Sequence, residues 1–284
     1  MNTPVRLHGL SKSFDGVLAV DSVDLVVDAG EVVGLLGANG AGKTTVMRMI
    51  MGLLRPDGGD LAVFGAPPSR ASRREIGYLA QGLGLYVDLT VAENLRFARQ
   101  AYGVGSDRPT DPELADVGDM LVDELPLGLR RRAAFEMVLQ HRPRLLVLDE
   151  PTSGVDPLNR ARLWDRVRDA VDDGAAALVS THFTEEAQNC DRLVMMHEGR
   201  VAAAGTLAQI VGDRKAVSVT TDSWADAFTA LDGAGMSVAL HGRDLRVTGS
   251  DPAAVAEALG ALGGILSEVP ASFDEVFVEL CRRG

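Results

Sequence analysis

A glycine-rich stretch between a predicted strand and a predicted helix constrains the fold of this chain more than any other feature. Residues 37–45 read Gly-Ala-Asn-Gly-Ala-Gly-Lys-Thr-Thr, which matches the pattern Gly-x-x-x-x-Gly-Lys-Thr. The apolar run 31–36 is typical of a strand, and residues 45–54 have helical spacing. Glycines let successive backbone N–H groups turn toward an anion, and the start of the helix adds its positive end. The pattern therefore predicts a phosphate-binding loop in an α/β fold.

Each residue of this loop is a candidate nucleotide-binding residue: Gly37, Ala38, Asn39, Gly40, Ala41, Gly42, Lys43, Thr44 and Thr45. The Lys43 ammonium is expected to reach the β- and γ-phosphates of a nucleoside triphosphate, and the Thr44 hydroxyl is expected to bind Mg²⁺. A glycine-rich turn that arose by chance is the alternative interpretation, and the flanking strand and helix argue against it.

A pair of acidic residues follows a second buried strand. The apolar run 144–148 ends in Asp149-Glu150. A carboxylate such as Asp149 can hold Mg²⁺ directly or through water, and Glu150 can polarise a water toward the γ-phosphate. A strand that ends in Asp-Glu also arises by chance, so this prediction depends on the loop upstream. Together the two features predict a site that hydrolyses a nucleoside triphosphate.

Further polar groups follow the predicted strands. Gln81 comes after the strand 76–80, where its amide could sense Mg²⁺ or the γ-phosphate. His182 ends the strand 175–180, where its imidazole could contact the γ-phosphate. A third group comes just after the acidic pair: Ser153, Gly154, Val155 and Asp156. A lone histidine is more often structural, so the shared order of these groups along the chain carries the argument.

The charge balance bears on the class of partner. The chain has 28 Lys and Arg against 40 Asp and Glu, a net charge of −12. An acidic surface argues against a sequence-independent grip on nucleic acid, so no nucleic-acid partner is expected. Two basic clusters, Arg73-Arg74 and Arg130-Arg131-Arg132, are interpreted as solvated faces or partner contacts. No run approaches the ~18 apolar residues of a membrane span, so the chain is not expected to cross a membrane by itself.

A change of pattern near residues 211–216 divides the chain into two predicted domains, 1–212 and 213–284. In the first, strands alternate with helices, which predicts a mainly parallel sheet with its ligand at the carboxyl ends of the strands. Short strands are expected over 18–20 and 23–27, and a loop over 104–116. The second domain has the order strand-helix-strand-strand-helix-strand, which predicts a small α+β sandwich.

On these motifs the chain resembles the ATP-binding subunits of ABC transporters of the drug- and polyketide-export type. Residues 37–45 match the Walker A loop and 145–150 the Walker B strand with its catalytic glutamate. Gln81 matches the Q-loop, 153–156 the D-loop and His182 the switch histidine. The resemblance implies a P-loop NTPase cassette, with a mainly parallel sheet, an antiparallel β subdomain and a shortened helical subdomain over about 82–140, followed by a small C-terminal accessory domain.

Three further segments support the resemblance. Phe14 falls where an aromatic ring of the family stacks on adenine. Residues 85–95 are similar to the region that meets the transmembrane subunit, and residues 270–277 to the C-terminal tail of the exporter subgroup.

One motif departs from the family. Where a Leu-Ser-Gly-Gly signature is expected, the chain reads Leu125, Pro126, Leu127, Gly128 and Leu129. In the family this loop closes over the γ-phosphate held by the other subunit of a dimer. Proline has no N–H and leucine adds bulk where close approach is needed. The stretch 104–124 is also shorter than is usual in the family.

The resemblance implies an ATPase, with ATP and Mg²⁺ as cofactors, that acts at the inner face of the cell membrane and energises a separate membrane permease for export. The altered signature favours an asymmetric heterodimer with a second ATP-binding subunit. A homodimer that acts as a slow ATPase or as a nucleotide-gated regulatory module is the first alternative. A soluble ATP-dependent machine of the same fold, acting outside transport, is the second.

Overall fold

The computed structural model describes residues 3–105 and 111–283, which form two compact units. The first unit spans Met1–Val201 and the second Ala202–Gly284. This division falls within strand β9 (Arg200–Gly205), earlier in the chain than the change of sequence pattern at 211–216. Each unit has its own hydrophobic core.

The central sheet of the first unit has six strands and confirms the predicted α/β fold. Their order across the sheet is β5 (Ile76–Leu79), β6 (Leu145–Asp149), β7 (Ala176–Thr181), β3 (Val32–Leu36), β8 (Arg192–His197) and β9. The first five strands run parallel to their neighbours. Strands β3, β6 and β7 are buried along their whole length, which is why they read as continuous apolar runs.

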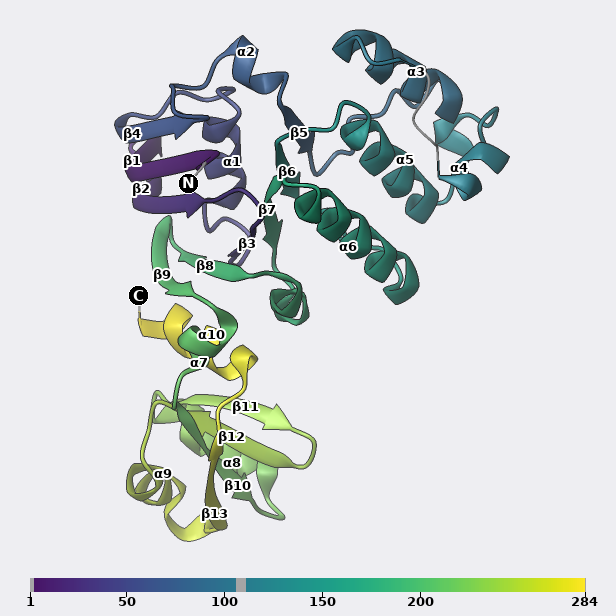
Figure 1. Cartoon of the computed structure of the whole chain (residues 1–284). Helices are drawn as coiled ribbons and strands as arrows, with labels where there is room; N and C mark the ends of the chain where they lie inside the picture. The colour runs from purple at the N-terminus through teal and green to yellow at the C-terminus, as the bar shows by residue number, and fades with distance from the viewer. Residues whose placement is uncertain (1–2, 106–110, 284) are drawn as a thin grey trace. The chain divides into compact units, whose positions relative to one another are not determined.

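An antiparallel sheet of three strands shares a hydrophobic core with helix α1 (Lys43–Ile50). Its order is β2 (Val17–Val27), β1 (Val5–Phe14) and β4 (Gly58–Val63), and Figure 1 shows it beside α1. The expectation of separate strands over 18–20 and 23–27 was wrong. The polar residues between them lie within one long strand, whose pairing with β1 is interrupted by register shifts.

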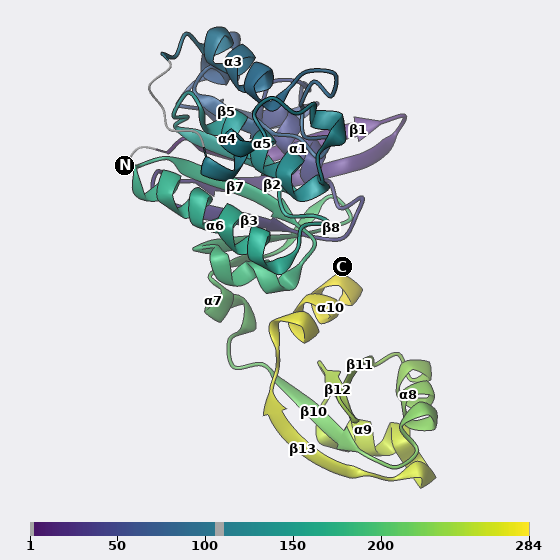
Figure 2. The ribbon, with the colours of Figure 1, turned by 90° about the vertical axis from the view of Figure 1, so that its right-hand side faces the viewer.

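Helices cover the other face of the central sheet and extend from it as a helical segment (Figure 2). Its elements are α3 (Val91–Tyr102), α4 (Pro112–Asp116), the 3₁₀ turn η1 (Val122–Glu124) and α5 (Leu127–Leu139), whereas the short helix α2 (Arg70–Arg73) lies between β4 and β5 in the chain. Helix α6 (Pro157–Asp172) and the 3₁₀ turn η2 (Thr184–Asn189) follow the sheet strands β6 and β7. The expected loop over 104–116 was wrong at its end, where Asp111 caps the short helix α4 and Pro112 begins it. Residues 106–110 of that loop lie outside the described part of the chain.

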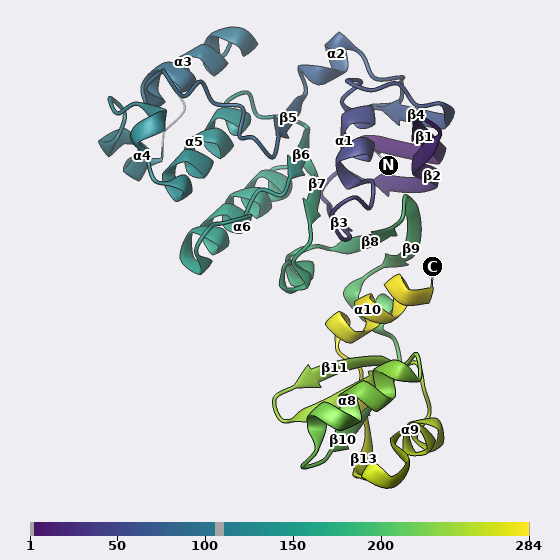
Figure 3. The same cartoon turned by 180° about the vertical axis from the view of Figure 1, so that it is seen from behind.

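The second unit is the expected α+β sandwich. Its antiparallel sheet has the order β11 (Ser237–His241), β12 (Asp244–Thr248), β10 (Lys215–Thr220) and β13 (Ile265–Pro270). Alternate residues of the strands pack against α8 (Trp224–Gly233) and α9 (Pro252–Leu259), and Figure 3 shows these two helices beside the sheet. The remaining helical elements are α7 (Leu207–Val211), the 3₁₀ turn η3 (Gly260–Leu262) and α10 (Phe273–Arg283).

The lengths and apolar character of the helices show whether any of them could span a membrane. Within residues 3–105 and 111–283, none combines the length and the apolar character that crossing a bilayer requires.

Candidate functional site

The glycine-rich loop joins the carboxyl end of β3 to the start of α1. Gly40 and Gly42 have φ of 85° and 99°, a backbone region that favours glycine. A Cβ on Gly37 would lie 2.4 Å from the carbonyl oxygen of Met196, so that position has no room for a side chain. A pocket opens over the loop, and its lining residues include Ala19, Asn39, Gly40, Ala41, Gly42, Lys43, Thr44, Thr45, Gln81 and Glu150.

Lys43 supplies a cation to this pocket. Its Nζ donates to the carbonyl oxygens of Gly37 at 2.6 Å and Ala38 at 3.0 Å. Burial lowers the pKa of Lys43, and the carboxylates of Glu150 and Asp149 act in the opposite direction. The ammonium is thus held inside the loop by neutral carbonyls, which phosphate oxygens can replace.

Asp149 connects the loop to two strands of the sheet. Its Oδ2 accepts a hydrogen bond from Thr44 Oγ1 at 2.9 Å, and its Oδ1 accepts one from Ser180 Oγ at 2.6 Å. Asp149 and Ser180 are partners in the parallel pairing of β6 and β7, which brings their side chains together at the carboxyl edge of the sheet. Both residues are buried, so the carboxylate is fixed at the start of α1.

Glu150 has an unusual backbone conformation. Its φ is 50°, in the left-handed region that residues with a Cβ adopt at a cost. Its N–H donates to the carbonyl oxygen of Ser180 at 3.2 Å and to Ser180 Oγ at 3.0 Å. Its Oε1 lies 3.3 Å from Nδ1 of His182. Strained residues of this kind concentrate at functional sites, and here the strain occurs at the predicted catalytic base.

The sequence interpretation missed Ser180, although a signal for it was available. Ser180 is a fully buried hydroxyl near the end of an apolar strand, and a buried hydroxyl needs a partner. The pairing of β6 with β7 provides two partners, the Asp149 carboxylate and the Glu150 N–H. This hydroxyl therefore fixes both acidic residues at once.

We expect Ser180→Ala to lower the maximal rate of ATP hydrolysis about tenfold. Loss of a buried hydrogen-bond partner costs about 1–3 kcal/mol, and 1.4 kcal/mol corresponds to a factor of 10. Steady-state phosphate release gives the rate, and ATP titration of the same protein is expected to give a Kd within about twofold of wild type. Ser218→Ala, in the second unit, is the matched control, and an equal loss of rate in both variants would contradict the role of Ser180.

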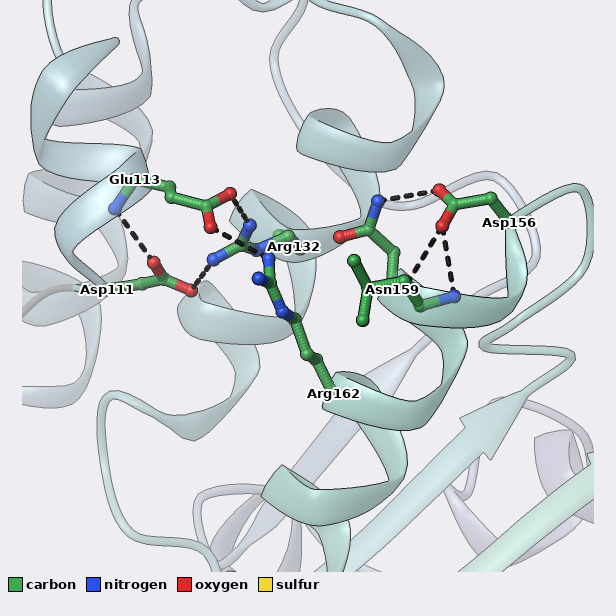
Figure 4. Close-up of polar contacts among 7 residues, drawn as sticks. Asp111, Glu113, Arg132, Asp156, Asn159 and Arg162 are labelled. Carbon is green, nitrogen blue, oxygen red and sulfur yellow. Dashed lines mark hydrogen bonds and ion pairs between the residues drawn. The ribbon is translucent and has the colours of Figure 1, made fainter.

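The segment after Glu150 turns into helix α6. The Ser153 N–H donates to the Glu150 carbonyl at 3.3 Å. Asp156 caps α6, where its carboxylate accepts from the N–H groups of Leu158 and Asn159 and from the Asn159 side chain, as Figure 4 shows for Asn159. The hydrogen bonds from Asn159 and Leu158 hold the pKa of Asp156 below its ordinary value. The segment 153–156 is thus fixed at its two ends.

The stretch 125–129 begins helix α5. Pro126 is the N-cap residue and provides no side-chain cap, and its carbonyl accepts the Arg130 N–H at 3.1 Å. The Leu127 side chain is 46% exposed, and its Cδ2 would lie 3.1 Å from a Cβ placed on Gly154. The first N–H groups of a helix have no partner within it, so Leu127, Gly128 and Leu129 present donors at this end.

The interpretation of Arg130-Arg131-Arg132 as a solvated or partner-binding cluster was wrong. Arg131 and Arg132 are 7% and 9% exposed. Arg132 pairs with Asp111 and Glu113 of the α4 segment, as Figure 4 shows, and Arg130 donates to the carbonyl oxygens of Leu125 and Asp123. Local sequence indicates charge density but not these partners, which come from other elements.

The structure brings most of the predicted site residues together. Gln81 and Glu150 line the loop pocket with the residues of the loop itself, and His182 contacts Glu150. Phe14 ends β1, is 46% exposed and lies under Lys12, whose Nζ is 5.6 Å from the ring centroid. It is not among the residues given above for the pocket, so its role as an adenine platform stays a prediction.

The chain is similar in sequence to known proteins. A family model described as ABC transporter matches residues 20–153. The chain is 40% identical over 215 residues to the probable multidrug ABC transporter ATP-binding protein YbhF of Escherichia coli, a match that covers 72% of this chain and 37% of that protein. It is 35% identical over 296 residues to the Nod factor export ATP-binding protein I of Burkholderia lata, covering 99% of this chain and 97% of that protein.

A solved structure gives the same result for the fold. An ATP-binding subunit of an ABC transporter superposes with a TM-score of 0.68 at 32% identity, over 72% of this chain and 91% of that one.

Proposed function

Because this chain belongs to the ATP-binding subunits of ABC transporters and is an ATPase of that family, we propose that it hydrolyses ATP to drive export through a separate membrane permease. The observation that carries the proposal is one connected set of contacts. Thr44 of the loop bonds to Asp149, Ser180 joins Asp149 to the Glu150 backbone, and His182 contacts the Glu150 carboxylate. The name of the Burkholderia lata relative supports export as the direction.

Each group has a chemical role in this proposal. The loop amides and the Lys43 ammonium bind the phosphates of ATP, and Phe14 stacks on adenine. Glu150 orients a water and accepts its proton. The water oxygen bonds to the γ-phosphorus as the bond to the β–γ bridging oxygen breaks, which releases ADP and inorganic phosphate. His182 contacts the γ-phosphate and holds the Glu150 carboxylate beside it.

The site also fits Mg²⁺. Mg²⁺ prefers oxygen ligands, and the Thr44 hydroxyl and the Asp149 carboxylate already meet at 2.9 Å beside the loop. Gln81 lines the same pocket and supplies a side-chain oxygen. We therefore assign these three residues to Mg²⁺, which neutralises charge on the β- and γ-phosphates when bound.

The permease contact is placed on residues 85–95 in this proposal. Tyr86 and Val87 are about half exposed, and the Tyr86 ring meets Phe97 edge-on with centroids 5.1 Å apart. The buried Asn94 amide bonds to the Tyr86 backbone, which fixes the shape of this exposed apolar segment. Through this contact the chain is held at the inner face of the membrane.

We further propose that the chain works in a heterodimer with a second ATP-binding subunit. A composite site would receive the start of α5 from the neighbouring subunit. Pro126 offers neither an N–H nor a hydroxyl there, and the exposed Leu127 side chain occupies the space beside Gly154. A partner with a serine and a glycine at these positions would complete the site that contains the Walker residues of this chain. The second site, formed by the partner's Walker residues and residues 125–129 of this chain, would hydrolyse ATP slowly.

A homodimer is favoured by a different observation. The N–H groups of Leu127, Gly128 and Leu129 still lie at the positive end of α5. These donors suit a γ-phosphate even without the serine hydroxyl. In this alternative two equal and weakened sites give a slow ATPase or a nucleotide-gated module.

Restoration of the signature tests whether the altered stretch limits turnover, and the native mass of the complex distinguishes the two assemblies. For both assemblies we expect slow phosphate release by the purified chain and an increase of about tenfold or more in Pro126→Ser/Leu127→Gly, because a missing transition-state donor costs roughly 10²–10³-fold in rate. Pro112→Ser, at the start of α4, is the control. The native mass of the complex from its own cells gives the composition directly. Vigorous, cooperative turnover by the chain alone that restoration leaves unchanged would refute the asymmetric assembly.

A further inference from the structure

Arg131 extends from helix α5 to the backbone beside the catalytic glutamate. Its Nη1 donates to the Glu150 carbonyl oxygen at 2.9 Å and to the Pro151 carbonyl oxygen at 3.1 Å. The side chain is 7% exposed, so water does not compete freely for these bonds. Burial lowers the pKa of Arg131, with the Glu150 carboxylate acting in the opposite direction, and an arginine keeps its charge under such a shift. The buried positive charge of Arg131 therefore has two neutral backbone carbonyl oxygens as its hydrogen-bond partners.

The backbone at Glu150 needs such support. The left-handed conformation at φ 50° is unfavourable for a residue with a Cβ, so surrounding contacts must maintain it. Ser180 holds the N–H of Glu150 from β7, and Arg131 holds its carbonyl from α5. These contacts act on opposite sides of the residue and together fix the direction of its side chain, which lines the loop pocket.

Arg131 has different hydrogen-bond partners from the arginines on either side of it. Arg130 bonds to carbonyls just before α5, and Arg132 bonds to the carboxylates of Asp111 and Glu113. Both neighbours therefore stabilise the helical segment itself. Within the described part of the chain, Arg131 is the member of this triplet that reaches the Walker B residues.

We propose that Arg131 is a positioning residue for hydrolysis, which holds Glu150 in its left-handed conformation and links the placement of α5 to the direction of the catalytic carboxylate. This inference rests on the proposed role of Glu150. Since α5 begins at the altered stretch 125–129, the same helix that meets the neighbouring subunit also sets the geometry of the base in its own subunit.

The test uses the full-length chain in the assembly that it forms, with single-turnover hydrolysis of γ-labelled ATP and a separate titration of ATP affinity. In Arg131→Gln we expect the rate per bound ATP to fall at least tenfold, with the Kd for ATP within threefold of wild type. Arg131→Lys is expected to recover part of the rate, because an ammonium can still donate to one carbonyl. If Arg131→Gln is unstable, Arg131→Met replaces it, because methionine retains an apolar stem for packing. The same fall in the rate per bound ATP is then expected.

Arg132→Gln is the matched control, because it removes a buried arginine one position away that does not contact Glu150. It is expected to lower the melting temperature and to change the single-turnover rate less than threefold. Equal rate losses in the Arg131 and Arg132 variants would show a general structural role and overturn the inference.

A double-mutant cycle makes the link to Glu150 explicit. If Arg131 acts through Glu150, then Arg131→Gln added to Glu150→Gln will not lower the residual rate further, whereas independent effects would multiply. Multiplied losses overturn the inference and leave the proposed function intact. A wild-type rate in Glu150→Gln alone overturns the proposed function, and this inference with it, so the two failures are distinguishable.

Discussion

Glu150→Gln is expected to lower the rate of ATP hydrolysis about a thousandfold and to leave ATP binding within about twofold of wild type, since general-base catalysis contributes roughly 10²–10⁴-fold. Glutamine keeps the size of the side chain and can still form hydrogen bonds, but its amide cannot accept a proton from the attacking water. The Glu150 N–H and carbonyl are held by Ser180 and Arg131, contacts that the substitution leaves in place. Binding and turnover should therefore separate.

Phosphate release under single-turnover conditions measures the chemical step, and calorimetric titration measures binding. Glu136→Gln provides the control, because Glu136 is also buried but pairs with Arg166 away from the loop pocket. Loss of ATP binding in Glu150→Gln would contradict its assignment as a base that acts only after the nucleotide is bound.

Lys43→Met is expected to weaken ATP binding by roughly a hundredfold or more, because each hydrogen bond from a charged group contributes about 1.5–3 kcal/mol. Methionine retains the apolar stem that is buried in the loop, so the change isolates the ammonium. Without it, the triphosphate would face the carboxylates of Glu150 and Asp149 with no opposing side-chain charge from the loop. Isothermal titration with ATP and Mg²⁺ gives the Kd.

Lys215→Ala is the control for Lys43→Met. Lys215 lies in the second unit and pairs with Glu268 at the surface, so its removal takes away one positive charge without touching the loop. Retention of wild-type affinity in Lys43→Met would mean that residues 37–45 are not the phosphate site.

Sequence patterns predicted the elements whose formation depends on local signals. Helix α6 is an example, because Asp156 supplies a cap, Pro157 suits the first helical position, and the apolar residues repeat at helical spacing. The buried parallel strands were predicted from continuous apolar runs. Both signals lie within the element itself, so no knowledge of the fold was needed.

The contacts that pattern reasoning missed depend on residues that are distant in the chain. Ser180 becomes informative only when β7 pairs with β6 and places its hydroxyl beside Asp149. Arg131 was interpreted as solvated because a run of three arginines is usually exposed, yet the fold places carbonyls of the Walker B segment within its reach. Motif spacing indicated the groups that we propose bind nucleotide, but not the groups that hold them in place.

The left-handed backbone of Glu150 affects how the sequence of this chain can evolve. Glycine adopts this conformation without the cost of about 1–2 kcal/mol that a Cβ brings, so glycine would relieve strain at this position but would remove the base. Selection for stability and selection for turnover therefore oppose each other at a single residue. A descendant of this chain that no longer needs hydrolysis could acquire glycine at this position and become a more stable protein that binds nucleotide without hydrolysing it.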